Sequence, residues 1–244
     1  TRLQGDWSSD VCSSDLLKIC LLLIVAVALA FAPTPPTVSD TWNSNIFMNT
    51  THIGSPSHFI SLHASLSHGN GQRIDAFTPL GPFMTFDSCN AKTAFEYLAL
   101  TETCNTRPLN CSVNPFFDDW FAFLPYSKFV GKAPYGNSEV CDMWEVNSPD
   151  GNEIVVAGID GSTPCFLVTI DKKNAMEDVF LFYDFVPSVQ PDWLNIPRAC
   201  STASASPAAI SAVRTNAGLT AQMQQATNAL HRMGERISRV VDQL

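Results

Sequence analysis

The amino-acid sequence predicts a mostly β domain, a sandwich or a partly open barrel, that is stapled by disulfides and followed by an amphipathic helix. Short runs in which apolar and polar residues alternate, separated by turn residues, predict antiparallel strands. An even set of cysteines between Cys89 and Cys200 predicts the disulfides. A heptad pattern of apolar residues over 216–244 predicts the helix.

Turn clusters between apolar runs predict three hairpins. These hairpins join 60–67 to 73–77, 140–146 to 153–157, and 154–158 to 165–170. Further strand candidates are 177–185 and, more weakly, 93–100 and 127–132. Residues 116–124 are aromatic, and their periodicity fits either a short helix or a buried strand.

The start of the chain is interpreted as lying outside the folded domain. Residues 6–16 read like one frame of a common sequencing-adapter oligonucleotide, so we interpret 1–16 as an artefact rather than a Ser/Asp-rich N-terminus. The apolar run that follows Lys18 ends in small-x-small cleavage patterns and predicts a signal peptide at 17–30. The run is shorter than the roughly 20 residues of a membrane-spanning helix. A retained membrane anchor is the alternative, since no methionine opens the chain.

Of the eight cysteines, two (Cys12 and Cys20) fall in these first segments, and six remain. The six are Cys89, Cys104, Cys111, Cys141, Cys165 and Cys200. An even number behind a leader predicts three disulfides, and no Cys-x-x-Cys pair indicates a metal site. We expect Cys104–Cys111 to close a local loop, and Cys89 and Cys200 each to reach a central strand.

The charge balance excludes one class of partner, and the sequons indicate a secreted glycoprotein. The formal net charge is −9, with the acidic residues concentrated before Cys200, which argues against nucleic-acid binding because that needs basic surfaces. Asn49 and Asn110 each open a glycosylation sequon, which predicts surface loops in a glycoprotein. With the leader, these features predict a secreted protein, with the lysosomal lumen as an alternative location.

After Cys200 the composition changes. Residues 201–215 are small and polar, typical of a linker, and 216–244 are expected to form the helix. Its apolar seam consists of Leu219, Met223, Ala226, Leu230, Met233, Ile237, Val240 and Leu244. The seam predicts either a homodimer or a contact with a partner helix; the alternative is a helix packed on its own domain.

Residues with obvious chemistry are few. The sequence contains none of the common catalytic motifs and leaves no spare cysteine, so we predict neither an enzyme nor a cofactor. Four histidines are close in sequence, but the odd spacing of the last three would place successive ones on opposite faces of a strand, which is poor geometry for a metal site. We therefore interpret them as surface residues, with a pH sensor as the alternative. They are His52, His58, His63 and His68. Asp118-Asp119 and residues 150–153 are weak calcium candidates, because Asp-Gly pairs form turns first.

Aromatic residues are abundant between residues 116 and 193. They are enough to line an apolar cavity between curved sheets, although an ordinary aromatic core is the alternative. The predicted pocket residues are Phe121, Phe123, Trp144, Phe166, Phe180 and Phe182.

Four places in the chain carry a family resemblance. They are Trp42 at a first strand, the hairpin at 64–77, the Cys141-Asp-Met-Trp144 strand, and a closing half from Pro164-Cys165 through Pro187, Trp193 and Pro197 to Cys200. In their order and spacing, these places resemble the ependymin-related secreted glycoproteins, with residues 31–200 as the family domain. The resemblance implies two curved antiparallel sheets stacked face to face, similar to bacterial lipoprotein carriers of the LolA type. It also implies a deep hydrophobic pocket for lipids, dimers in some members, and calcium or matrix binding in others.

The sequence therefore predicts a secreted, non-enzymatic protein that holds a hydrophobic, lipid-like ligand between two sheets. One alternative is an extracellular-matrix or cell-adhesion glycoprotein that works with calcium, a matrix partner and its C-terminal helix. Another is a non-catalytic module of a larger protease.

Overall fold

The computed structural model describes residues 33–52, 58–67, 70–78, 81–98, 103–109, 120–136, 139–196, 200 and 232–243. The chain divides into two compact units, 1–34 and 35–244, and the fold described below belongs to the second. In the described part of this unit no helix is long and apolar enough to cross a membrane.

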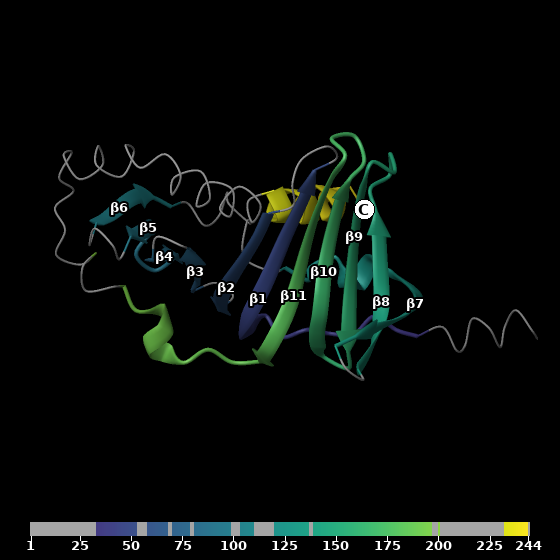
Figure 1. The fold of residues 1–244 in the computed structure, drawn as a ribbon, viewed down its shortest axis with the longest axis horizontal. Helices are drawn as coiled ribbons and strands as arrows, with labels where there is room; N and C mark the ends of the chain where they lie inside the picture. The colour runs from purple at the N-terminus through teal and green to yellow at the C-terminus, as the bar shows by residue number, and fades with distance from the viewer. Residues whose placement is uncertain are drawn as a thin grey trace, which may run out of the picture. The chain divides into compact units, whose positions relative to one another are not determined.

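All the described strands belong to one antiparallel sheet (Figure 1). They are β1 (Thr41–His52), β2 (His58–Ser67), β3 (Gly71–Thr78), β4 (Gly81–Ser88), β5 (Thr93–Leu98), β6 (Thr103–Pro108), β7 (Lys128–Tyr135), β8 (Glu139–Asn147), β9 (Glu153–Asp160), β10 (Thr163–Asp171) and β11 (Met176–Val186). The order across the sheet is β6-β5-β4-β3-β2-β1-β11-β10-β9-β8-β7. Two meanders, β1–β6 and β7–β11, are thus joined where β1 pairs with β11.

The three predicted hairpins are confirmed. They correspond to β2–β3, β8–β9 and β9–β10, whose registers place Ser67 opposite Gly71, Asn147 opposite Ile154, and Asp160 opposite Thr163. Strands β4 and β6 were not predicted. β4 opens with Gly-Pro, and β6 is a polar edge strand, so neither carries a clear apolar alternation.

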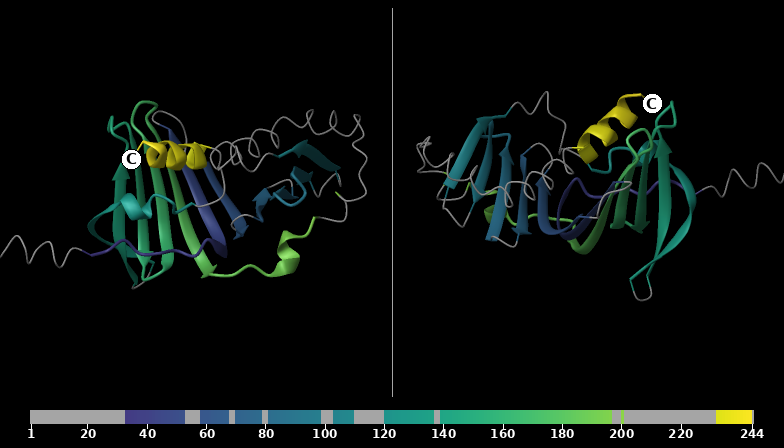
Figure 2. Two further views of the ribbon diagram at one scale, coloured as in Figure 1. Left: turned by 180° about the vertical axis from the view of Figure 1, so that it is seen from behind. Right: turned by 45° about the horizontal axis from the view of Figure 1, so that its top comes forward.

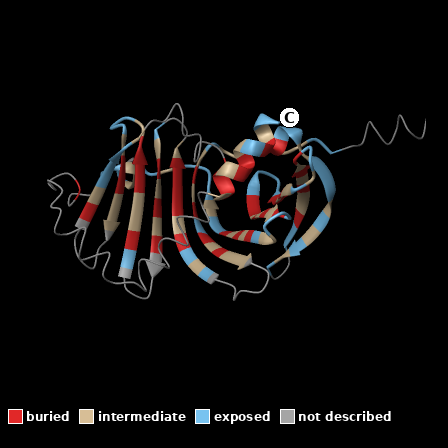
Figure 3. Ribbon diagram, turned by 90° about the horizontal axis from the view of Figure 1, so that it is seen from above, coloured by how far each residue is buried: buried red, intermediate tan, exposed pale blue. Residues whose placement is uncertain are grey.

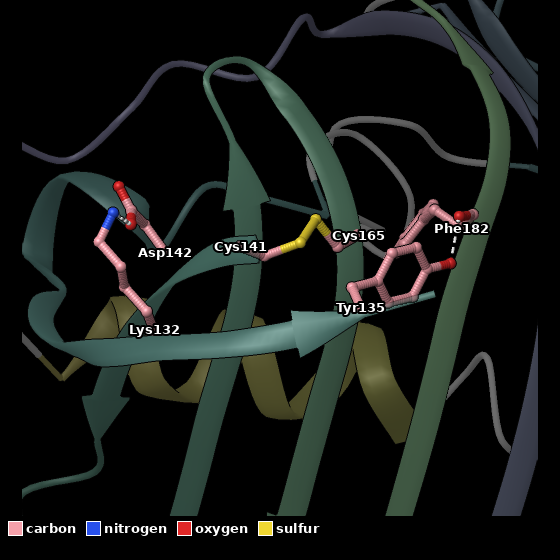
Figure 4. The surroundings of a disulfide bond; sticks show 6 residues. All are labelled: Lys132, Tyr135, Cys141, Asp142, Cys165 and Phe182. Carbon is pink, nitrogen blue, oxygen red and sulfur yellow. Dashed lines mark hydrogen bonds and ion pairs between the residues drawn. A yellow bond between two sulfur atoms is a disulfide. The ribbon is translucent and has the colours of Figure 1, made fainter. Parts of the chain in front are cut away.

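The mostly β, disulfide-stapled architecture with a C-terminal helix is confirmed, and the structure refines the sheet arrangement. The sheet does not divide into two stacked layers, because β1 pairs with β2 on one side and with β11 on the other. It curls instead. The Tyr135 hydroxyl of β7 donates a hydrogen bond to the Phe182 carbonyl of β11, 2.6 Å away, although three strands lie between them in the sheet order (Figure 4). This half of the sheet is a half-barrel.

The disulfides partly correct the expected pairing. Cys141 of β8 is bonded to Cys165 of β10 across the end of β9 (Figure 4). The curl of the sheet brings these two cysteines within reach of each other. Cys104 is bonded to Cys200, so the expected Cys104–Cys111 loop is wrong. Cys200 reaches the edge strand β6 and not a central strand. The segment before it already lies towards that edge, since Trp193 is beside His63 of β2 and Leu194 packs with Phe86 of β4. Cys89 is also disulfide-bonded. Cys111 lies outside the described residues.

The C-terminal helix, residues 232–242, lies across one face of the sheet (Figure 2) and inside its curl (Figure 3). Its seam residues Met233, Ile237 and Val240 are at most 4% exposed and belong to the main hydrophobic core. Over the described residues the seam therefore packs on its own domain. The other seam residues, 219–230 and 244, lie outside the described residues, so the homodimer expected through this seam stays a prediction.

Candidate functional site

The candidate site is the face of the sheet that meets the C-terminal helix, here called the inner face. Strand alternation places Phe180 and Phe182 of β11 and Trp144 of β8 on it, and the turn before the short helix η2 (Leu124–Tyr126) adds Phe121 and Phe123. These five predicted pocket residues are 0–3% exposed in one core cluster.

Phe166, the sixth predicted pocket residue, lies on the opposite face, here called the outer face. The pairing of β9 with β10 shifts register between Pro164 and Phe166, and Leu167 is the next residue that points inward. Phe166 instead covers Gly158, where an added Cβ atom would lie 2.2 Å from the Phe166 ring. The structure therefore separates Phe166 from the other five.

Two tryptophans that were not among the predicted pocket residues lie at the centre of the inner-face cluster. The Trp42 and Trp120 rings meet edge to face with centroids 5.2 Å apart, and Trp120 lies 6.0 Å from Phe180. Phe182 contacts Trp42 at 6.0 Å and Phe121 at 5.7 Å. Such edge-to-face contacts stabilise aromatic clusters beyond their buried area. They fix the turn at 120–123 onto the sheet.

On the inner face, three buried polar atoms of the sheet and of the turn at 120–123 have no hydrogen-bond partner among the described residues. They are the indole Nε1 atoms of Trp120 and Trp144 and the amide Oε1 of Gln72. Buried polar groups in native proteins are almost always paired, because an unpaired one costs about 1–3 kcal/mol. The inner face therefore carries two donors and one acceptor without a partner among the described residues, at separate places between β3 and β8.

A buried carboxyl group lies beside Gln72. Asp87 of β4 is the cross-strand neighbour of Gln72 and is 8% exposed. Burial raises the pKa of Asp87 to about 6, an effect that Arg107 opposes and Glu96 supports. The inner face thus has an aromatic region and, over β3–β5, a polar end.

Stability should depend on pH through Asp87. Its pKa is higher in the folded chain (about 6) than in the unfolded chain (3.8), so the folded state binds the proton more tightly. The free energy of unfolding should therefore fall as pH rises from about 4 to about 6, by at most about 3 kcal/mol. Asp87→Asn should remove this fall and be more stable than the wild type at pH 7, as measured by urea unfolding across pH. Asp160→Asn, at the exposed end of β9, is the control. Parallel pH curves for the wild type and Asp87→Asn would contradict the assignment.

Buried ion pairs hold the helix against the inner face. Arg236 donates to Asp178 over 3.0 Å and to the Thr169 hydroxyl over 2.9 Å, while Arg232 lies 3.3 Å from the same aspartate. The side chains of Arg236 and Asp178 are only 2% and 0% exposed. The Thr50 hydroxyl of β1 donates to Asp178 Oδ1, the oxygen that Arg232 also contacts, whereas Arg236 donates to Oδ2. This network fixes the position of the helix on β10 and β11.

The remaining predicted sites lie elsewhere. Asp150 accepts hydrogen bonds from Ser148 and Asn152, which lower its pKa to about 2 and mark a turn between β8 and β9. No group of three potential metal ligands occurs among the described residues. Asn49 lies within the central strand β1 and not in a loop. Asn110 and the Asp118-Asp119 pair lie outside the described residues, as does His68.

No family model and no curated protein matches the chain. Solved structures with a similar fold include a LolA superfamily protein from Nitrosomonas europaea, with 8% identity and a TM-score of 0.39 over 67% of this chain and 93% of the other. An uncharacterised conserved protein from Thermus thermophilus has 12% identity and a TM-score of 0.41 over 74% and 95%. The Pseudomonas aeruginosa MucA/MucB complex has 12% identity and a TM-score of 0.37 over 67% and 59%. Similarity at this level carries no inference about function.

Proposed function

We propose that this chain is a secreted, non-enzymatic binding protein that holds an amphipathic, lipid-like ligand against the inner face of its half-barrel. The observation that carries the proposal is the set of buried polar atoms that have no partner among the described residues and lie on the face that holds the aromatic cluster. Apolar burial supplies affinity of roughly 25 cal/mol per Å² before ordering costs. The unpartnered donors and acceptor would then orient the ligand's polar group.

The resemblance to the ependymin-related glycoproteins supports the same class of function. Extracellular location agrees with the leader-like segment and with the disulfides Cys104–Cys200 and Cys141–Cys165. The membership in that family is itself part of the proposal.

Native mass spectrometry of the protein secreted from eukaryotic cells tests the proposal. We expect a bound species with the mass of a lipid, released on denaturation, in addition to the mass of the glycosylated chain. Repeated preparations that contain only the polypeptide and its glycans, and that take up no added fatty acid, would overturn it.

A binding assay with cis-parinaric acid, a fluorescent fatty acid, tests the site itself. Trp144→Phe removes one unpartnered indole donor with little change in shape, and should weaken binding about 3- to 10-fold, the equivalent of one hydrogen bond. Trp193→Phe, on the outer face, is the matched control and should bind as the wild type does. If Trp144→Phe and the wild type bound cis-parinaric acid with equal affinity, the Trp144 indole would not be part of the binding site.

A further inference from the structure

A second pocket lies on the outer face, on the side of the sheet away from the proposed lipid site. Its volume is about 670 Å³, within the range of roughly 300–1,000 Å³ that small-molecule sites occupy. The short helix η3 (Pro191–Leu194), which follows β11, covers it. The pocket is therefore formed between the sheet and a segment that crosses it.

The floor of the pocket is one row of cross-strand neighbours. The row runs from β1 to β5 through Asn45, His63, Asp75, Met84 and Tyr97, each directly opposite the next. Side chains opposite one another in adjacent strands share a face, so all five point outward. The floor is consequently polar at its β1 end and apolar at its β5 end.

Trp193 forms the roof and is held by contacts at the polar end. Its ring centroid lies 4.4 Å from that of His63, and the Arg73 guanidinium carbon lies 5.9 Å from it. Arg73 also donates to the Trp193 carbonyl over 3.2 Å. Leu194, the last residue of η3, packs on a second apolar cluster that includes Phe86, and the Cys104–Cys200 disulfide ties the following stretch to β6. Trp193 is thus anchored on both sides of the pocket.

Among the described residues that line the pocket, one carboxylate has no cation beside it. Arg73 donates to both oxygens of Asp75, over 2.8 and 3.1 Å, so these two charges neutralise each other. Asp192 lies at the exposed mouth, where its hydrogen bond comes from the uncharged Asn195. Burial lowers the pKa of His63, against a smaller opposing effect of Asp75, and its Nδ1 lies 2.9 Å from the Asn45 amide oxygen. A neutral His63 adds no positive charge at neutral pH.

We propose that this pocket binds a small aromatic amine in its protonated form. The ring system would lie between Trp193 and the Met84–Tyr97 end of the floor, where aromatic and thioether groups favour planar apolar partners. The ammonium group would point to Asp192 at the mouth. An anionic ligand of the same size would meet that carboxylate and find Arg73 already paired. The site shares neither its floor row nor its roof with the proposed lipid site and does not depend on it.

Two dansyl probes that differ only in charge test this proposal. Dansylcadaverine carries an ammonium group at the end of a five-carbon chain, and dansyl-6-aminohexanoate carries a carboxylate on a chain of equal length. Fluorescence titration of the full-length protein at pH 7.4 (about 0.15 M salt) gives the affinity for each. We expect saturable binding of the amine, at least about 5-fold tighter than the acid.

Three variants locate the binding. Trp193→Ala should weaken amine binding about 10-fold or more, and Asp192→Asn should weaken it about 3- to 5-fold without changing binding of the acid. Phe59→Ala, an exposed ring elsewhere on the outer face, should bind as the wild type does. Because Asp192 is exposed, Asp192→Asn should leave the fold intact even if Trp193→Ala does not fold.

Prior loading with fatty acid should not displace the amine, which separates this site from the inner face. Absence of saturable amine binding would overturn the proposal. Equal affinity of the protein for the two probes would also overturn it. The same holds if Trp193→Ala and Asp192→Asn both bind the amine with an affinity within about twofold of the wild-type affinity. None of these results would bear on the lipid site, which is tested by mass spectrometry and parinaric acid.

Discussion

Phe180→Ala should lower the free energy of unfolding by about 3–5 kcal/mol, the range for removing a fully buried aromatic ring. Phe180 is 0% exposed, is the cross-strand neighbour of Met48 and Leu167, and contacts Trp120 edge to face. The substitution removes apolar contacts on several sides and leaves a cavity that this rigid sheet cannot close. Urea unfolding at 25 °C with the disulfides intact, followed by tryptophan fluorescence, measures the change.

Two other phenylalanines serve as matched controls. Phe59 is 61% exposed, so Phe59→Ala should change stability by less than about 0.5 kcal/mol. Phe166→Ala should fall between the two, because this ring is partly exposed but covers Gly158. If Phe166→Ala were as costly as Phe180→Ala, the placement of Phe166 on the outer face would be wrong.

Arg236→Met should also cost about 3–5 kcal/mol, because it leaves Asp178 buried without its principal cation. Arg232 lies near the same aspartate but is 28% exposed, and its contact of 3.3 Å is longer than that of Arg236. The loss should appear first as detachment of the C-terminal helix. Hydrogen exchange over 232–242, together with urea unfolding, measures it.

A double variant and a surface control separate charge from packing. Arg236→Met combined with Asp178→Leu should recover part of the stability, since the fully buried Asp178 charge is then gone, while Asp171, 3.9 Å from Arg236 in the wild type, still lacks that cation. Arg239→Met breaks the more exposed ion pair with Glu153 and should cost at most about 1 kcal/mol. A double variant as unstable as the single one would show that the pair matters through its shape rather than its charge.

Much of the secondary structure could be predicted because it depends on neighbours in sequence. Alternation at Leu62, Ala64 and Leu66 identifies β2, and Gly/Asp turns identify the hairpins β2–β3, β8–β9 and β9–β10. Strand β6 lacked such a signal, because an edge strand with one partner can be polar.

The candidate site was predictable only in part. Five of six aromatic candidates share the inner face: period-two alternation within β8 and β11 sets the facing of Trp144, Phe180 and Phe182, whereas Phe121 and Phe123 reach this face from a turn. Phe166 differs because the register shift beside it reverses which side chains of β10 point inward, and no local pattern encodes that shift. The roles of Gln72 and Asp87 also had no sequence signal, since burial without partners appears only after folding.

The sequence alone determined the mostly β architecture, the presence of disulfides and the amphipathic character of the last helix, because each follows from residue type and short-range spacing. Only the tertiary structure decided that β1 pairs with β11, that Cys104 bonds to Cys200, and that Trp193 lies over His63 and Arg73. These contacts join residues about 100 or more apart in the chain, and which of them form depends on how all the competing pairings pack together.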